Sequence, residues 1–183
     1  MIKRKFKVSV VLPVFNGEKT LVSTLDSLVA QTFKDFELIA CIDGTNDASE
    51  AILNSYKSKF KELIILKNVI NLGLGPTMNR LVACTSGEYI AIEEQDDFYY
   101  NNRLELQVKL LDERPDVGLV SGIAEFWDGT KVTGKFPGLL VHGGQSPKGE
   151  KLFLLNYRNQ IKVVNSCMMI RKKGHIENGL YVT

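Results

Sequence analysis

The sequence predicts an α/β fold, a three-layer sandwich in which helices cover both faces of a mostly parallel central sheet. Short apolar runs alternate with amphipathic segments at least four times along the chain. This alternation is typical of parallel sheets whose strands are joined by helices. A length of 183 residues corresponds to about one domain and is enough to bury a core. We therefore expect residues 1–183 to form a single domain.

The expected strands are apolar runs, several of them rich in β-branched residues. They comprise residues 8–12, 36–42, 63–66, 89–92, 117–126 and 163–170. Pro13 ends the first run, and the turn formers Asp128 and Gly129 predict a hairpin that continues into residues 131–133. The run at 89–92 has no polar face, which favours a strand buried on both sides.

The expected helices show apolar residues at helical spacing. The apolar positions are Leu21, Leu25, Leu28 and Val29 in the first helix, Ile52, Tyr56 and Phe60 in the second, and Leu104, Val108 and Leu111 in the fourth. Asp47 or Ser49 is suited to cap the second helix, and Pro76 fits the first position of a third helix that runs to about Cys84. Residues 136–149 predict a mobile loop and residues 151–157 a short helix.

Polar side chains cluster where the first, second and fourth strands end. Right-handed crossovers place the carboxyl ends of these parallel strands at one edge of the sheet. Residues 13–18, 43–47 and 94–97 are therefore expected to converge on one crevice. Ligands bind at such an edge in open α/β sheets.

Three carboxylates, Glu94, Asp96 and Asp97, stand within four residues. They repel one another unless a cation or hydrogen-bond donors neutralise them. Mg²⁺ or Mn²⁺ suits carboxylates that also face a substrate phosphate. The alternative is a solvated acidic turn between a strand and a helix. Their place at the end of the fourth strand favours the metal site.

Composition and charge exclude several classes of protein. Apolar residues make up 44% and charged residues 24% of the chain, as in ordinary soluble domains. A net charge of +2 is too small to indicate a nucleic-acid partner. Basic residues crowd the N-terminus, at Lys3, Arg4, Lys5 and Lys7. This cluster favours either peripheral contact with an anionic membrane or a simply solvated tail.

The expected compartment is reducing. The three cysteines, Cys41, Cys84 and Cys167, are odd in number, far apart and set among apolar residues, which predicts free buried thiols. No apolar run approaches the roughly 20 residues of a membrane helix. Residues 8–15 are short, are broken by Ser9 and Pro13, and are followed by no small-residue cleavage site, so we expect a first strand and not a signal peptide.

Four segments resemble the signatures of family 2 glycosyltransferases, the inverting enzymes with the A-type nucleotide-sugar-binding fold. The segments are residues 10–18, 27–37, 43–47 and 94–97. The third resembles the family's "DDGSxD", and the fourth occupies the position of its "DxDD". Order and spacing agree from about residue 7 to residue 171. The resemblance implies the glycosyltransferase A-type fold and a nucleoside diphosphate sugar as donor.

The resemblance assigns donor-binding roles to residues after the first two strands. Pro13 would fix a bend, so that the backbone of Val14 and Phe15 flanks the nucleotide base, and Asn16 belongs to the same signature. Asp43 would accept the ring N–H of uracil or a similar base. The alternatives are core packing for Phe15 and a turn or helix-cap role for Asp43.

Further positions follow the family or depart from it. Glu18 would bind ribose or sugar hydroxyls, unless it is a carboxylate of the first helical turn. Asn79 matches the asparagine of the family's "ARNxG". Met78 stands where the family has an arginine that meets phosphate or acidic neighbours. Arg80 points about 200° around the helix from Met78 and is a poor substitute.

The acidic stretch receives three roles from the resemblance. Asp96 would be the metal ligand for Mn²⁺ or Mg²⁺. Glu94 replaces the family's first aspartate, which faces the ribose, so its longer side chain would shift that contact or make it through water. Asp97 would support the site, or else cap the helix expected near Asn101.

The resemblance implies transfer of a sugar to an acceptor hydroxyl with inversion, in the synthesis of cell-surface polysaccharides or glycans. The acceptor would be a glycan or a lipid-linked glycan, and the location cytoplasmic, including the inner face of the membrane. The family's general base follows the strand that residues 163–170 resemble. The only acid beyond it is Glu177, to which we assign no catalytic role, so the base remains unknown. We therefore expect a truncated chain that binds the donor and transfers poorly. The alternative is a non-catalytic nucleotide-sugar-binding or interaction module.

Overall fold

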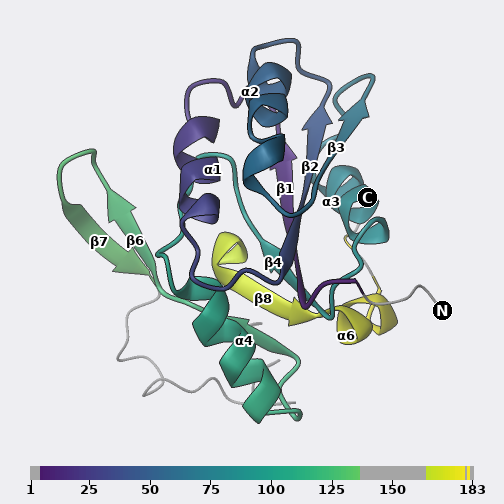
Figure 1. Cartoon of the computed structure of the whole chain (residues 1–183), viewed down its shortest axis with the longest axis vertical. Coiled ribbons are helices and arrows are strands. Elements are labelled where there is room, and N and C mark those ends of the chain that lie inside the picture. Colours follow the sequence, from purple (N-terminus) through teal and green to yellow (C-terminus); the bar gives the residue numbers. More distant parts are fainter. Residues whose placement is uncertain (1–4, 137–163, 180, 182–183) are drawn as a thin grey trace, which may run out of the picture.

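The computed structural model describes residues 5–136, 164–179 and 181, and it confirms the mostly parallel sheet (Figure 1). The strands lie in the order β3-β2-β1-β4-β8-β5. Their bounds are Val8–Val14 (β1), Phe36–Asp43 (β2), Leu63–Asn68 (β3), Tyr89–Ile92 (β4), Leu119–Ser121 (β5) and Met168–Arg171 (β8). Strands β1 to β4 pair in parallel, whereas β8 is antiparallel to both β4 and β5. Strand β1 lies between β2 and β4, so the three ends that carry polar residues are neighbours.

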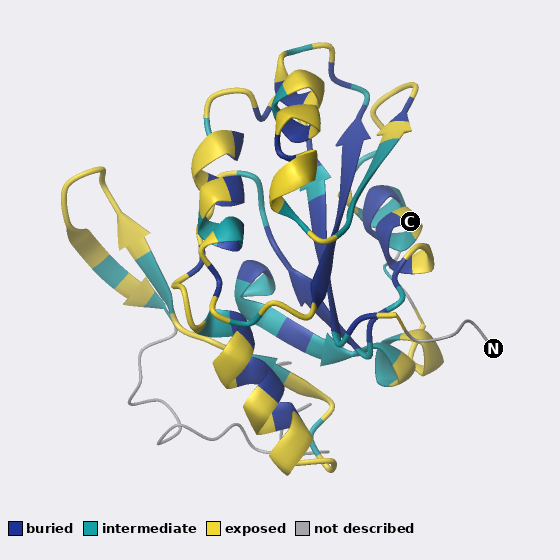
Figure 2. Ribbon diagram, viewed as in Figure 1, coloured by how far each residue is buried: buried dark blue, intermediate teal, exposed yellow. Residues whose placement is uncertain are grey.

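Helices cover both faces of the sheet, which confirms the three layers (Figures 1 and 2). On one face, α1 (Leu21–Val29), α2 (Ser49–Ser55) and α4 (Arg103–Glu113) bury their leucines against β1, β2 and β4. On the other, α3 (Leu74–Ala83) packs Met78, Leu81 and Val82 on the same strands. Each fully buried apolar side chain contributes about 1.5–3 kcal/mol. The central strands β1, β2 and β4 are thus buried on both sides, as expected of strands that carry apolar residues on both faces.

The predicted fifth strand, 117–126, is wrong as one element. It divides into β5 and β6 (Ala124–Trp127), and β6 pairs with β7 (Val132–Phe136) in a separate two-stranded sheet. The two halves have different partners: β5 pairs with β8, and the N–H of Gly122 still donates to the carbonyl of Cys167 (3.2 Å), before the chain leaves the main sheet for β6. The hairpin predicted from Asp128 and Gly129 is confirmed.

Other boundaries also differ from the predictions. Pro76 is the third residue of α3, not the first, because the loop before it is held so that the helix begins at Leu74. Helix α2 ends at Ser55, and Lys57–Lys59 forms a 3-10 turn. The last predicted strand is shorter: a 3-10 turn at Asn165–Cys167 (η3) precedes β8, and α6 (Lys172–Glu177) follows it. The predicted loop at 136–149, apart from Phe136, and the predicted helix at 151–157 lie outside the described residues.

The cysteines are free, as predicted, but burial holds for Cys41 alone. Burial raises the pKa of its thiol to about 11. Cys84 is exposed at the end of α3, and Cys167 is half-buried. None of the helices among the described residues has the length and apolar character to cross a membrane.

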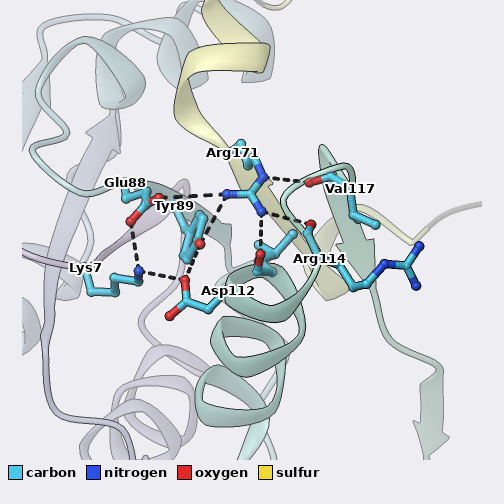
Figure 3. Close-up of polar contacts among 8 residues, drawn as sticks. Lys7, Glu88, Tyr89, Asp112, Arg114, Val117 and Arg171 are labelled. Carbon is cyan, nitrogen blue, oxygen red and sulfur yellow. Dashed lines mark hydrogen bonds and ion pairs between the residues drawn. The ribbon is translucent and has the colours of Figure 1, made fainter.

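A polar network fastens β8 to the strand and helix beside it (Figure 3). Arg171, the last residue of β8, donates to the carbonyl oxygens of Val117 (2.7 Å), Arg114 (3.1 Å) and Leu111 at the end of α4. It also reaches the hydroxyl of Tyr89 on β4 (3.3 Å). The other members are Lys7, Glu88 and Asp112. The network fixes β8 against β4, and with it the η3 turn that lies beside the acidic stretch.

Candidate functional site

A cleft of about 330 Å³ opens at the carboxyl ends of β1, β2 and β4. Its lining residues are Pro13, Val14, Phe15, Asp43, Asn71, Gly73, Leu74, Thr77, Glu94, Gln95 and Asp96. The predicted convergence of the three strand ends is therefore confirmed. Asp43 belongs to β2, whereas Glu94 and Asp96 follow β4, with the end of β1 between them.

Gln95 joins the end of β1 to the acidic stretch. Its side-chain amide donates to the carbonyl of Phe15 and accepts from the N–H of Phe15, both at 2.7 Å. A Cβ on Gly17 would lie 2.9 Å from the Gln95 oxygen, so a larger residue would press on this amide. The hydroxyl of Thr24, on α1, lies 2.8 Å from the carbonyl of Gln95 and 2.7 Å from that of Asp97. The backbone of both walls is thus held before any ligand arrives.

Asp43 is buried and organises the loop between β3 and α3. Its carboxylate accepts from the side-chain amide of Asn68 (2.7 Å) and from the N–H groups of Leu72 (2.8 Å) and Gly73 (3.0 Å). Burial alone would raise its pKa, but these hydrogen bonds, with one from Thr77, hold the pKa below its usual value. Asp43 is therefore ionised at neutral pH. Asp43 thus has the turn role given above as an alternative. It also lines the cleft, where a nucleotide base could reach it.

Gly44 permits this loop to close over β2. Its φ is +73°, in the left-handed region that favours glycine. A Cβ at this position would lie 2.2 Å from the backbone N of Asn71. The glycine of the "DGTND" segment is therefore required by the close approach of a second chain segment.

The neighbours of Glu94 act on its pKa in opposite directions. Burial, with the charges of Asp97 and Asp96, raises the pKa of Glu94, and a hydrogen bond from the amide of Asn165 in η3 (3.3 Å) opposes the rise. Asp96 is exposed and lines the cleft. A cation near these carboxylates would relieve their repulsion.

Within the part of the chain that the structure describes, no three His, Cys, Asp or Glu side chains are grouped as a metal site. One carboxylate still fits Mg²⁺ or Mn²⁺ that arrives with a diphosphate, because Mg²⁺ is usually bound through one or two carboxylates plus substrate phosphates and water. The described cleft lining also contains no Lys or Arg. Phosphate charges entering it would meet three carboxylates and no positively charged side chain of this lining unless a cation accompanied them.

A buried layer beneath the acidic stretch was missed from the sequence. Glu93 is fully buried, one of its carboxylate oxygens accepts the N–H of Glu94 (3.1 Å), and the other has no hydrogen-bond partner among the described residues. Burial raises its pKa well above the ordinary value. Tyr99 donates to the carbonyl of Ile92 (2.6 Å), and the Arg103 guanidinium lies 3.5 Å from the Tyr99 ring centroid. This layer fixes the chain on both sides of the cleft carboxylates.

Four residues predicted to bind the donor lie outside the cleft lining. Asn16 is exposed, with a φ of +55°, and accepts from the Thr45 hydroxyl (2.7 Å). Glu18 accepts the N–H of Ala48 (3.3 Å) before α2, so it serves a helix start. The Asn79 amide bonds to both backbone groups of Tyr181, each at 2.9 Å. The positions of Asn16, Glu18 and Asn79 outside the cleft lining therefore do not support their predicted contacts with the donor.

Asp97 is the fourth of these residues. It is exposed, and its N–H closes a turn onto the carbonyl of Glu94 (3.2 Å). The alternative role as a helix cap is wrong, because α4 begins at Arg103 after Asn102. Met78 is fully buried against the sheet, and Arg80 donates to the carbonyl of Lys67 (2.9 Å). Arg80 thus lies outside the cleft lining and is bonded to the end of β3.

Several cleft residues were not singled out from the sequence. They are Asn71, Gly73, Leu74, Thr77 and Gln95. The sequence did contain a signal for the loop residues. An acid at the end of a buried strand, here Asp43, needs hydrogen-bond donors, and a short glycine-rich loop offers backbone N–H groups that such an acid can bind.

Comparison with known proteins adds the relatives of the chain. The profile of glycosyl transferase family 2 matches residues 9–179. An uncharacterized glycosyltransferase of Methanocaldococcus jannaschii is 38% identical over 123 residues, which are 66% of this chain and 42% of that protein. A poly(ribitol-phosphate) beta-glucosyltransferase of Bacillus spizizenii is 38% identical over 95 residues, 50% of this chain and 15% of that protein. The chain thus matches less than half the length of either relative.

Solved structures share the fold over nearly the whole chain. S. aureus TarS in complex with UDP aligns with a TM-score of 0.73 and 21% identity, over 97% of this chain and 50% of that one. The mannosyltransferase PcManGT from Pyrobaculum calidifontis, in complex with GDP-Man and Mn²⁺, aligns with a TM-score of 0.71 and 14% identity, over 100% of this chain and 50% of that one. These likenesses establish the glycosyltransferase A-type fold expected from the sequence.

Proposed function

The chain belongs to glycosyl transferase family 2, and we propose that its cleft binds a nucleoside diphosphate sugar together with Mn²⁺ or Mg²⁺. In the whole protein, the sugar passes with inversion to the hydroxyl of a glycan or lipid-linked acceptor. The proposed setting is cell-surface polysaccharide synthesis at the cytoplasmic face of the membrane. The name of the relative from Bacillus spizizenii, a poly(ribitol-phosphate) glucosyltransferase, supports this setting.

One observation carries the proposal: Asp43 and Asp96 line the same cleft from different strand ends, with Phe15 in the wall between them. An ionised carboxylate at one end suits the ring N–H of a base such as uracil. The side chain of Phe15 is 44% exposed, which leaves its ring free to pack on the base. The titles of the matched structures name UDP and GDP-Man as ligands of those proteins and support a nucleotide in this cleft.

The remaining donor contacts follow from this placement. Pro13 and Val14 line the cleft beside Phe15, whose backbone N–H and carbonyl are both bonded to the Gln95 amide. Glu94, oriented by Asn165, faces the ribose or the sugar. Asp97 keeps its supporting role as part of the proposal, through its backbone turn onto Glu94.

Asp96 would hold the metal ion, with phosphate oxygens and water as the other ligands. When bound, a divalent ion neutralises the charge that develops on the leaving diphosphate. The chain's own contribution is to hold the backbone on both sides of Asp96, because the Thr24 hydroxyl bonds to the carbonyls of Gln95 and Asp97. The absence of Lys and Arg from the described cleft lining makes this neutralisation depend on the ion.

Proton removal from the acceptor requires a further base. The three carboxylates of the described lining, Asp43, Glu94 and Asp96, are each committed to the donor in this proposal. We therefore expect the 183-residue chain to bind the donor and to transfer sugar slowly or not at all.

Isothermal titration calorimetry with UDP, GDP and dTDP, each with and without Mn²⁺, tests the proposal. We expect saturable binding of one of them that strengthens with Mn²⁺. Absence of binding by all three would contradict it. Robust turnover by this chain would contradict the expectation of weak transfer.

A second candidate is a non-catalytic nucleotide-sugar-binding or interaction module. The buried Met78, in place of a phosphate-binding arginine, favours it. The two candidates differ at Asp96, because an interaction module would be indifferent to its loss.

A further inference from the structure

The β6–β7 hairpin projects from the body of the molecule (Figure 1). Two of its aromatic side chains are exposed. Trp127 is 51% exposed and Phe126 57% exposed. Tyr100, from the segment between β4 and α4, is 62% exposed and donates from its hydroxyl to the Glu125 carboxylate on β6. Aromatic surface on this scale is a poor match for water and suits a bound partner.

The strand alternation separates these side chains into two faces. The pairing register shifts between Phe126 and Trp127, and the extra residue, Thr133, lies on β7. Strand β6 therefore keeps its alternation, in which residues two apart share a face: Glu125 and Trp127 lie together, and Phe126 lies on the other side. Lys135 is the cross-strand partner of Glu125, and its ammonium lies 2.5 Å from the Glu125 carboxylate. We call the set Tyr100, Glu125, Trp127 and Lys135 the hairpin face. It has an aromatic side chain on each side of an ion pair.

Phe126 has its own arrangement on the opposite face. Its partner across the hairpin is Gly134, and a Cβ there would lie 3.3 Å from the Phe126 ring. Phe126 therefore packs across the hairpin backbone and provides a matched control of similar size and exposure.

The hairpin joins the body near the acidic end of the cleft. Gly122, just before β6, donates to the carbonyl of Cys167 in η3 (3.2 Å). The same turn contains Asn165, which bonds to Glu94. In the sheet order β3-β2-β1-β4-β8-β5, Asp43 on β2 lies on one side of the Glu94–Asp96 segment, and β5, which leads into the hairpin, lies on the other. A donor that runs from Asp43 to Asp96 therefore directs its sugar toward the hairpin side.

We propose that the hairpin face binds the sugar rings of the acceptor glycan, an inference that rests on the proposed function. A sugar ring has an apolar C–H face and a rim of hydroxyls. Tyr100 and Trp127 present flat apolar surfaces with polar tips, and Glu125 and Lys135 offer a charged acceptor and donor for hydroxyls. Because Tyr100 is bonded to Glu125 in the free protein, little freedom is lost when a ring stacks on it.

Other occupants fit this surface less well. The Glu125–Lys135 pair has no net charge, so it does not attract an anionic bilayer. The four side chains also form a small patch, whereas a stable second copy needs about 1,000 Å² or more of buried surface.

Trp127 is the only tryptophan in the sequence, so intrinsic fluorescence reports directly on the hairpin face. The probes are chitotetraose, cellotetraose and mannotetraose, titrated into the full 183-residue chain. We expect a saturable change in emission with at least one of them. Tyr100→Ala should raise its Kd by about twofold to tenfold, the range that an aromatic contact supplies. Tyr100→Phe, which keeps the ring, and Phe126→Ala, on the opposite face, should change the Kd less than Tyr100→Ala does.

Several outcomes would overturn the inference. They are no emission change with any of the three sugars, an equal loss in Phe126→Ala and Tyr100→Ala, an emission shift with phosphatidylglycerol vesicles alone, and an emission shift on concentrating the protein alone. Calorimetry with UDP on the same variants separates this inference from the proposed function. Unchanged UDP binding with no sugar response removes the hairpin site alone, whereas a sugar response without nucleotide binding removes the proposed function.

Discussion

Replacing Asp43 tests whether a buried carboxylate builds the cleft wall. Asp43→Asn keeps the size of the side chain but removes its charge. The remaining oxygen can still accept from Asn68 and Leu72, while the new NH₂ group faces the N–H of Gly73. A hydrogen bond to a charged group contributes about 1.5–3 kcal/mol. The variant loses the hydrogen bond from Gly73 and weakens the two from Asn68 and Leu72. The free energy of unfolding should therefore fall by about 3 kcal/mol, which lowers Tm by about 6–12 °C for a domain of this size.

The assay is urea unfolding followed by circular dichroism, together with nucleotide calorimetry. Asp47→Asn is the matched control, because Asp47 accepts the N–H groups of Glu18 and Ser49 (both 3.0 Å) and lies outside the cleft lining. It should cost about 1 kcal/mol, as for a lost helix cap, and leave UDP binding intact. Asp43→Asn should weaken UDP binding, because Asn71 and Gly73 form part of the wall.

The effect of Asp43→Asn should also depend on pH. The pKa of the folded-state carboxyl is below its usual 3.8, so its stabilisation is present above that value and is lost as the pH falls through the lowered pKa. The difference in unfolding free energy between wild type and variant should therefore shrink in acid. The reasoning is refuted if Asp43→Asn unfolds like wild type or like Asp47→Asn, or if the difference is unchanged in acid.

The other predictions concern the same walls. Gly44→Ala should lower stability by about 3 kcal/mol or more in thermal melting, because left-handed strain of about 1–2 kcal/mol adds to the clash with Asn71. The control Gly129→Ala has a φ of +97° and meets no neighbouring atom within 4 Å, so it should lose only the strain energy. Equal losses would contradict this. Gln95→Ala should cost about 1–3 kcal/mol and weaken UDP binding, and unaltered stability would refute the proposed clamp on Phe15. Because burial raises the pKa of Glu93, its unfavourable ionisation should lower wild-type stability as pH rises above about 4.5. The free energy of unfolding of Glu93→Gln, measured relative to that of wild type, should therefore increase as the pH rises above about 4.5. If this difference did not change with pH, a raised pKa of Glu93 would be contradicted.

Periodicity and strand-end chemistry were sufficient to predict the sheet and its polar edge. Strands β1, β2 and β4 carry apolar residues on both faces, from which their burial follows, although β1 and β2 also bury the hydrogen-bonded pair Ser9 and Glu37. The split of residues 117–126 into β5 and β6 could not be predicted in this way. Both halves carry apolar residues, and what separates them is the choice of partner: β5 pairs with β8, which is distant in sequence, whereas β6 pairs with β7. Likewise, nothing local to Pro76 reveals that Asp43 holds the preceding loop and starts α3 early.

The candidate site was predictable where side chains act directly and not where they act through the backbone. Asp43, Glu94 and Asp96 were identified because carboxylates that directly follow buried parallel strands stand where α/β sheets bind ligands. Asn16, Glu18 and Asn79 fit the same signatures, yet their side chains pair with Thr45, Ala48 and Tyr181 instead of facing the cleft. Gln95 was passed over because its role, two bonds to one residue's backbone, depends on the distance between two strand ends.

Metal-dependent nucleotide binding by Asp96→Asn tests the central claim most directly. Calorimetry would compare the Kd of UDP, or of GDP or dTDP if either binds more tightly, with and without Mn²⁺ in wild type, Asp96→Asn and the control Asp47→Asn. We predict that Mn²⁺ lowers the Kd at least about tenfold, equal to about 1.4 kcal/mol, in wild type and Asp47→Asn. In Asp96→Asn, Mn²⁺ should leave the Kd unchanged. Full Mn²⁺ dependence in Asp96→Asn would contradict the assignment of Asp96 as the metal ligand of the donor site.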